Sequence, residues 1–432
     1  MIVNIDKMST DIKKTQNVFT EVMTPIVYKL PHASKSMQNA SINPQLSINI
    51  DYPSFSLGFQ HYIHANKEKL DLTDQFKEKK KVYRVVNRFN RYIDDHDTDI
   101  DKMSKVFFDI DPKPHIANDD FFKYWEILCM FDLCKSSSSI SSAHMMENGG
   151  ALQALLLFRD MFNAKGSKSD KYTIIESADE NKHKDALNDK FMTYYKKEKP
   201  QRVNVSNSAK KCDIVTLSCG NHWDYRNLKE QDSLKLFLEQ LSVAIECQDK
   251  GSSMICKIHE SYTLALNKLV YLLSELYDET YVIKPLTSKP SNSEKFIVFK
   301  GYTNKGDKVL KIIKSILSDM KSNKNLFLVN FCKDFDLPND FIAAIRKMNS
   351  EISNKQLINV NNIVDFINKE NYFGDQYQTY RLQQIESANH WIARFYPNKK
   401  DFQNHIKEIE SETKKLASLA QERIDKLSEK LV

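Results

Sequence analysis

The sequence predicts an α/β protein with a mostly parallel sheet, helices on both sheet faces, and irregular or helical regions before and after the sheet. Two observations lead to this. Between residues 117 and 302, short apolar segments typical of strands alternate with amphipathic segments typical of helices. Beyond Gly301, apolar residues follow the helical period. The 432 residues therefore divide into an N-terminal region (1–115), an α/β domain (116–302) and a helical C-terminal region (303–432).

Seven short segments rich in apolar and β-branched residues are expected to form the sheet. They are Ile140–Met146, Tyr172–Glu176, Arg202–Val205, Asp213–Leu217, Ser253–Lys257, Thr280–Lys284 and Lys295–Lys300. The last two are joined by a loop without a helix. This predicts an antiparallel hairpin that closes one edge of the sheet.

Helices are expected between the strands and throughout the C-terminal region. The segments are Asp119–Phe131, Ala151–Phe162, Asp232–Cys247, Tyr262–Leu276, Asp307–Lys321, Asn339–Asn349, Ile363–Lys369, Gln376–Phe395 and Phe402–Val432. Residues 1–65 are polar and interrupted by prolines, which indicates an arm or a loosely packed cap. Residues 70–108 are expected to be helical, with a basic run followed by an acidic one.

Composition excludes several classes of protein. A balance of 63 basic and 57 acidic residues, a net charge of +6, argues against a uniformly basic nucleic-acid coat but leaves a local basic groove open. We find no apolar run long enough to span a membrane and no secretory signal at the N-terminus. The seven cysteines are scattered and odd in number, which favours free thiols and the cytoplasm.

Four stretches carry candidate chemistry. Gly149 and Gly150 stand between an expected strand and helix, where glycines let a ligand approach the backbone. Lys257 ends a central strand, where open α/β sheets place their ligands. Glu294 opens the last strand and is placed to face Lys257 across the sheet, while Lys123 lies on the first helix. Each also has an ordinary interpretation as a turn residue or a surface charge. No cysteine or histidine pairs have the spacing of a metal site.

Together these stretches resemble the FtsJ/RrmJ-fold RNA 2′-O-ribose methyltransferases. The resemblance is closest to their Adrift-type cap-specific branch, found in eukaryotes and large cytoplasmic DNA viruses. It rests most specifically on YVIKPLTSKPSNSEKFIVFKGY, and also on MICK and FFKYWEILCMF. It covers roughly residues 117–302. The resemblance implies a Rossmann-like S-adenosylmethionine-dependent methyltransferase sheet that acts on capped mRNA, in host cytoplasm or virion if the protein is viral.

The family's Lys-Asp-Lys-Glu tetrad is matched here by Lys123, Lys257 and Glu294, while Ser218 in CDIVTLSCGNHWDY stands where the family has Asp. The resemblance makes Lys257 the proton acceptor, since a lysine near a second lysine has a lowered pKa. Ser218 brings no charge.

The resemblance also implies a site for S-adenosylmethionine at Gly149 and Gly150, with Glu176 near its ribose. The family has Pro-Gly in place of the Gly149-Gly150 pair. Two functions stay open. One is cap-specific mRNA 2′-O-methyl transfer, weakened by the missing Asp. The other is that of a catalytically inactive relative, which binds RNA or serves as a subunit beside other capping or transcription proteins.

Overall fold

The fold is given by a computed structural model. It describes residues 23–49, 53–79, 81–89, 116, 118–133, 138–145, 149–163, 165–176, 201–204, 211–218 and 229–395, and the single residues 411 and 418. The expected terminal helix Phe402–Val432 and the acidic run at 94–101 lie almost wholly outside these ranges. None of the helices described is long and apolar enough to cross a membrane.

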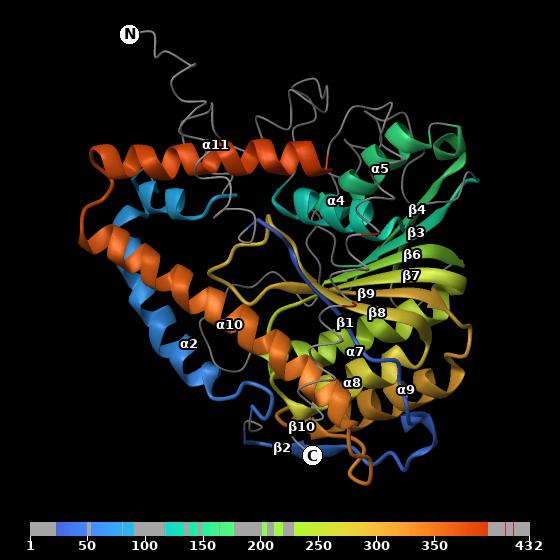
Figure 1. Cartoon of the computed structure of the whole chain (residues 1–432). Helices are drawn as coiled ribbons and strands as arrows, with labels where there is room; N and C mark the ends of the chain where they lie inside the picture. Colours follow the sequence, from blue (N-terminus) through green and yellow to red (C-terminus); the bar gives the residue numbers. More distant parts are fainter. Residues whose placement is uncertain are drawn as a thin grey trace.

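An eight-stranded sheet forms the centre of the described structure (Figure 1). Its strands are β1 (Ile26–Lys29), β3 (Ser141–Met145), β4 (Lys171–Glu176), β5 (Gln201–Asn204), β6 (Cys212–Ser218), β7 (Gln248–Ile258), β8 (Tyr277–Lys284) and β9 (Lys295–Tyr302). Their spatial order is β1-β8-β9-β7-β6-β3-β4-β5. The five neighbouring strands β5, β4, β3, β6 and β7 run parallel to one another, whereas β9 is antiparallel to both of its neighbours, β7 and β8. The predicted α/β class is confirmed.

The order of the parallel strands marks the place where open α/β sheets form a ligand-binding crevice. From β3 the chain proceeds to β4 and β5 on one side, and β6 leads to β7 on the other side. The direction of winding therefore reverses between β3 and β6. In open α/β sheets, ligands bind outside the carboxyl ends of the strands at such a reversal. Ser218 ends β6 in register with Lys257 of β7, so both residues lie at this edge.

Helices cover both faces, because successive strand residues point to opposite sides of a sheet. Met254 and Cys256 of β7 pack in the core with α7 (Lys229–Cys247), α8 (Leu264–Ser274) and α9 (Asp307–Ser322). Ile255 packs in the other core with α4 (Asp120–Phe131), α5 (Gly150–Phe162) and α11 (Asp375–Phe395). Lys257 lies two residues beyond Ile255 and so faces the α4 side.

The N-terminal region differs from the expected arm. Ile26–Lys29 pairs antiparallel with β8, so the hairpin of β8 and β9 does not close the edge of the sheet; β1 extends it. A second strand, β2 (Gln45–Ser47), pairs with β10 (Phe327–Asn330) in a small separate sheet. Within residues 69–86 the described helices are of the tight 3₁₀ type, at Lys69–Phe76 and Val82–Val86.

Two helices that were expected to be separate in the C-terminal region form a single helix, α10. α10 runs without a break through Asn339–Asn368 and buries Ile352, Gln356 and Val360, residues that lie between the two predicted segments. Burial of these side chains outweighs the modest helix propensity of the intervening serine and asparagine residues. The far end of α10 packs against Leu70, Phe76, Val85 and Val86 from the N-terminal region, with α2 (Phe59–Glu68) alongside (Figure 1).

A prediction concerns His144, which is fully buried where β3 meets β6. Its ring nitrogens lie 2.9 Å from Ser142 Oγ and 2.9 Å from Thr216 Oγ1. Burial lowers its pKa to about 3. The pKa of His144 is therefore lower in the folded protein than in the unfolded chain. Its contribution to the free energy of unfolding is complete above about pH 6.5 and is lost as the pH falls toward 3.

Because of this one histidine, the free energy of unfolding is about 2 kcal/mol smaller at pH 5 than at pH 8. We therefore expect His144→Asn, which removes the titrating ring, to flatten the dependence of Tm on pH between 4.5 and 7. Thermal unfolding across that range measures it. The exposed His61 provides the control variant His61→Asn, which is expected to keep the wild-type slope. Identical slopes in all three proteins would contradict the prediction.

Candidate active site

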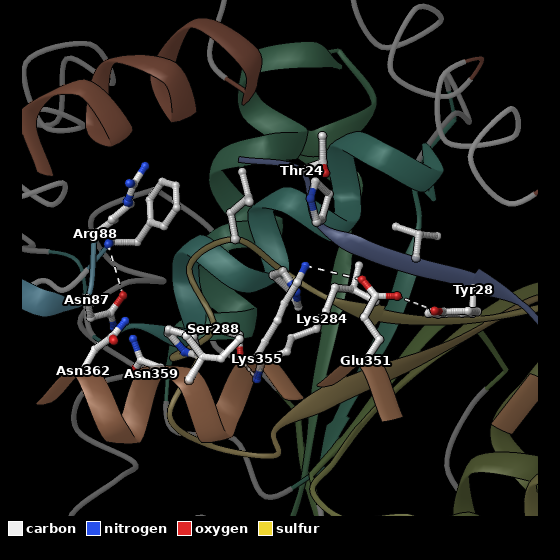
Figure 2. A pocket seen from close by; sticks show the side chains of 18 of the residues that line it. Thr24, Tyr28, Asn87, Arg88, Lys284, Ser288, Glu351, Lys355, Asn359 and Asn362 are labelled. Atoms are coloured by element: carbon white, nitrogen blue, oxygen red, sulfur yellow. Dashed lines mark hydrogen bonds and ion pairs between the residues drawn. The ribbon is translucent and has the colours of Figure 1, made fainter. Parts of the chain in front are cut away.

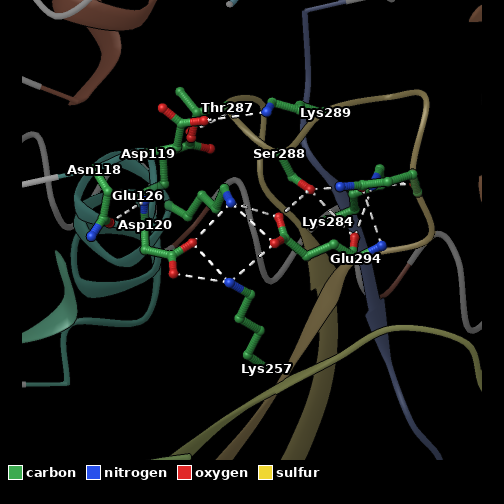
Figure 3. Close-up of polar contacts among 12 residues, drawn as sticks. Asn118, Asp119, Asp120, Glu126, Lys257, Lys284, Thr287, Ser288, Lys289 and Glu294 are labelled. Carbon is green, nitrogen blue, oxygen red and sulfur yellow. Dashed lines mark hydrogen bonds and ion pairs between the residues drawn. The ribbon is translucent and has the colours of Figure 1, made fainter. Parts of the chain in front are cut away.

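Four charged side chains meet beyond the carboxyl ends of the central strands (Figure 3). Lys257 Nζ lies 2.9 Å from Asp120 Oδ2 and 3.2 Å from Glu294 Oε2. Lys123 Nζ lies 2.9 Å from Asp120 Oδ1 and 2.8 Å from Glu294 Oε1. Each ammonium therefore bridges the same two carboxylates. These four residues form a closed ring of alternating charges, the Lys–Asp–Lys–Glu ring.

The ring is buried and electrically balanced. The exposed fraction of each of its side chains is at most 10%. Burying an ion is costly unless a partner and hydrogen bonds compensate it. Here two positive and two negative groups satisfy one another.

The sequence predicted that Lys123, Lys257 and Glu294 converge, and the structure brings them together. It did not predict Asp120. Asp120 lies in the first turn of α4, one turn before Lys123, and its backbone N–H donates to Asn118 Oδ1 at 3.0 Å. An acid three residues before a lysine on a helix shares a face with it, and this spacing was the available signal. This signal is weak, because acidic residues are common in the first turn of a helix, where the helix dipole stabilises their negative charge.

The ring shifts the pKa values of Asp120, Glu294 and Lys123. Burial opposes the charged forms, but the partner charges outweigh it. For Asp120, Lys123 and Lys257 lower the pKa to about 2. The same two lysines hold the pKa of Glu294 well below its usual range. Asp120 and Glu294 raise the pKa of Lys123 above its usual value. Proximity of a second lysine was expected to lower a lysine pKa; for Lys123 the two carboxylates reverse that expectation.

The loop between β8 and β9 fixes Glu294. Ser288 Oγ donates to Glu294 Oε1 at 2.9 Å. Lys284 Nζ donates to the carbonyl oxygens of Glu294 at 2.8 Å and of Asn292 at 2.9 Å. The KP and NSE parts of the sequence motif thus hold each other. Burial lowers the pKa of Lys284 to about 7, and Glu294 partly offsets this effect.

Glu126 connects α4 to the same loop. Its carboxylate accepts hydrogen bonds from the backbone N–H groups of Leu286 at 2.7 Å and Thr287 at 2.9 Å, and from Thr287 Oγ1 at 2.5 Å. Trp391 Nε1 of α11 donates to it at 3.0 Å. Burial raises the pKa of Glu126, although these donors oppose the change. One buried carboxylate therefore joins the helix that carries Asp120 and Lys123 to the loop that carries Glu294.

Gly150 determines how closely α5 approaches α4. A Cβ atom on Gly150 would lie 2.4 Å from Asn118 Oδ1, 2.8 Å from the backbone nitrogen of Phe121 and 2.9 Å from Asp120 Cβ. These distances are too short for any larger residue without movement of α4. Gly150 thus has a packing role beside the one expected from sequence. Gly149 precedes α5 with φ of 94°, a backbone conformation that favours glycine.

The remaining predicted residues, Ser218 and Glu176, are not members of the ring. The backbone of Ser218 exchanges two hydrogen bonds with the side chain of Gln240, at 3.1 and 2.8 Å. Its Oγ is buried and has no hydrogen-bond partner among the residues described. Glu176 is the last residue of β4 and pairs with Asn204 of β5, and its side chain lies outside the described structure. The ranges that the structure covers hold no group of three acidic, cysteine or histidine side chains placed to bind a metal ion.

Comparison with known families agrees with this geometry. Residues 125–302 match the family described as FtsJ-like methyltransferase. This FtsJ-like region contains the β7, β8 and β9 strands, Lys257 and Glu294, while Lys123 and Asp120 lie directly before it.

Three relatives show how far the similarity extends. An uncharacterized protein of Acanthamoeba polyphaga mimivirus is 25% identical over 378 residues, which cover 86% of this chain and 91% of that protein. The cap-specific mRNA (nucleoside-2′-O-)-methyltransferase 1 of Drosophila melanogaster is 28% identical over 149 residues, 33% of this chain and 19% of the relative. The inactive cap-specific mRNA (nucleoside-2′-O-)-methyltransferase 1B of Caenorhabditis briggsae is 35% identical over 103 residues, 23% of this chain and 12% of the relative.

A prediction follows for Glu126. Glu126→Gln places an amide NH₂ group among four donors, so at least one buried donor loses its acceptor. We expect a loss of about 2–4 kcal/mol in the free energy of unfolding. Denaturant unfolding measures this change. Glu246→Gln is the control, because Glu246 is a helical glutamate whose ion pair with Lys314 lies at the surface. We expect it to change stability by less than about 1 kcal/mol. Equal effects of the two substitutions would contradict the role given to Glu126.

Proposed function

We propose that this protein transfers a methyl group from S-adenosylmethionine to a ribose 2′-hydroxyl of RNA, with capped mRNA as the substrate. The observation that carries the proposal is the closed Lys–Asp–Lys–Glu ring at the carboxyl edge of the sheet. Lys123, Lys257 and Glu294 come from three separate segments of the chain, and the structure brings all three to one point. Asp120 supplies the carboxylate that the sequence lacks at Ser218.

In this proposal the two lysines have different tasks. The raised pKa of Lys123 keeps it protonated, which suits an anchor for Asp120 and Glu294. Lys257 gives up a proton to solvent before the reaction and then, as a neutral amine, accepts the proton that the 2′-hydroxyl loses as its oxygen attacks the methyl carbon. The two carboxylates then hold the resulting ammonium. Positioning of this kind accounts for much of the acceleration in transfers with a good leaving group.

The structure has features that suit the methyl donor. When bound, S-adenosylmethionine would supply a methyl group attached to a sulfonium, whose sulfur is a good leaving group. Its site is proposed in the crevice between the ends of β3 and β6. Here Gly149 has a backbone conformation that favours glycine, and the buried Oγ of Ser218 offers a polar atom without a partner among the described residues. The backbone of Gly149 and Gly150 would contact the donor, with Glu176 near its ribose.

The preference for capped mRNA rests on less of the chain. It is supported by the cap-specific relative of Drosophila melanogaster, of which the aligned part makes up 19% of the full protein. The relative of Caenorhabditis briggsae is named as inactive and gives no support to transfer. Cap recognition, and partnership with other capping or transcription proteins, are therefore further proposals beyond methyl transfer itself.

A second function has one observation in its favour. Each ammonium in the ring is already bound by both carboxylates, so the ring is also a stable arrangement without substrate. An inactive protein that binds RNA, as a subunit of a capping or transcription complex, would keep such a ring for stability. Binding of S-adenosylmethionine, measured by calorimetry, separates the two, since the methyltransferase requires it.

Lys257→Gln tests the proposal. Alanine is unsuitable, because removing a buried ammonium leaves Asp120 and Glu294 less compensated, at a cost of about 3–5 kcal/mol. Glutamine can still donate hydrogen bonds to the carboxylates but is not a base. We expect transfer to capped RNA to fall by about 100-fold or more, with donor binding retained.

The readout is mass-spectrometric detection of 2′-O-methylated nucleosides, with Tm measured to show that the variant is folded. Lys289→Gln is a matched control, since Lys289 forms a longer, partly exposed ion pair with Asp119 at 3.7 Å. It should transfer at close to the wild-type rate. Wild-type rates in Lys257→Gln would remove Lys257 from the mechanism.

A further inference from the structure

A pocket of about 840 Å³ lies beside the ring and is not used in the mechanism above. Four parts of the chain line it: the segment 24–28 that includes most of β1, the segment 86–89, the loop after β8, and one face of α10 (Figure 2). Pockets of this size are typical of sites for small molecules or single units of a polymer. The lining comes from the N-terminal and C-terminal regions as well as from the FtsJ-like region.

The charges around the pocket favour an anion. Arg88, Lys347 and Lys355 line it as cations, against a single acidic residue, Glu351, whereas the amine of Lys284 is already bound by the loop that carries Glu294. That carboxylate already has partners: the hydroxyl of Tyr28 donates to it, and Lys355 Nζ lies 3.4 Å away. An incoming phosphate would therefore meet cations, with the one acidic side chain already engaged.

Amide side chains add hydrogen-bonding groups to the charged lining of the pocket. Asn359 on α10 has an exposed fraction of 9%, and its Oδ1 atom has no hydrogen-bond partner among the described residues. Asn362 is exposed at the rim, and Ile358 is 53% exposed beside it. A buried acceptor without a partner is costly. A phosphate at neutral pH has little to donate to it, whereas the exocyclic amine of a nucleobase can donate.

The pocket wall and the ring share one loop. Lys284 and Ser288 line the pocket, and both also hold Glu294: Ser288 Oγ donates to its carboxylate at 2.9 Å, and Lys284 Nζ donates to its carbonyl oxygen at 2.8 Å. A polymer that presents one unit to the ring can therefore present a neighbouring unit to the pocket. A strand of RNA has both the phosphates and the bases that the pocket suits.

We propose that this pocket binds a nucleoside phosphate unit of the RNA substrate, other than the unit whose ribose enters the ring. The cations hold the phosphate and Asn359 accepts a hydrogen bond from the base. This inference rests on the proposed function for its RNA. The site chemistry is also that of a free nucleotide, and the experiment distinguishes the two sources.

The test compares two double variants that remove the same charge. Lys347→Ala/Lys355→Ala removes two pocket cations, one of them paired with Glu351. Lys311→Ala/Lys314→Ala removes two lysines from α9, one of them paired with Glu246 at 2.6 Å, in the layer packed on α7. Fluorescence anisotropy measures binding of a labelled capped oligonucleotide in a salt series, and unlabelled AMP and CMP are the free-nucleotide probes.

We expect the pocket variant to bind the oligonucleotide at least tenfold more weakly, with a shallower dependence on salt, and the α9 variant to bind as wild type. Equal affinities of the two variants would overturn the proposal. Displacement of the oligonucleotide by micromolar AMP or CMP would also overturn it, because the site would then be one for free nucleotides.

A third variant, Asn359→Leu, tests base recognition separately. It should reduce affinity with no change in salt slope, since no charge is removed; unchanged affinity would overturn the part given to Asn359. Binding and methyl transfer are measured on the same samples. RNA binding that needs the pocket, in a protein without transfer activity, would contradict the proposed function and leave the pocket supported. Transfer activity together with RNA binding that does not need the pocket would support the proposed function and overturn the pocket proposal.

Discussion

The buried contact of Asp120 with both lysines constrains much of the structure around it. Two ammonium groups this deep in a protein need two carboxylates, and the second comes from Glu294 on a distant loop. If any one of the four is displaced, a buried charge is left without its partner, which is expensive. The start of α4, the end of β7 and the entry to β9 must therefore meet within hydrogen-bond distance. The adjoining contacts serve this requirement.

Two of these adjoining contacts use the same device. Glu126 on α4 accepts hydrogen bonds from two successive backbone N–H groups and a threonine hydroxyl in the loop after β8. Glu230 on α7 does the same for Tyr262 and Thr263 after β7, at 2.7 to 2.9 Å. Burial raises the pKa of Glu126, and it raises that of Glu230 to about 6. A buried helix carboxylate thus anchors the loop after β7 and the loop after β8, which limits their movement beside the ring.

Much of the fold was predictable, because runs of β-branched residues between turn signals define the strands from β3 to β9 well. The convergence of Lys257 and Glu294 was predictable for the same reason, since strand ends meet at one edge. β1 was not, because four residues between Pro25 and Pro31 show no alternation, and all but one are buried. Nor was the continuity of α10, which depends on tertiary burial. Asp120 was missed because the position of a missing acid was sought on β6, at Ser218, whereas the structure supplies a carboxylate from the opposite helix.

We propose that Asp120 supplies one of the two carboxylates that the ring needs for methyl transfer. The most direct measurement is the rate of 2′-O-methyl transfer to capped RNA by Asp120→Asn and by its neighbour Asp119→Asn, with folding of each variant verified by its Tm. Asp119 is a suitable control because its ion pair with Lys289 is long and partly exposed. We expect Asp120→Asn to lose about 100-fold or more in rate and Asp119→Asn to retain nearly all of it. A folded Asp120→Asn protein that transfers methyl groups as fast as Asp119→Asn would contradict the claim.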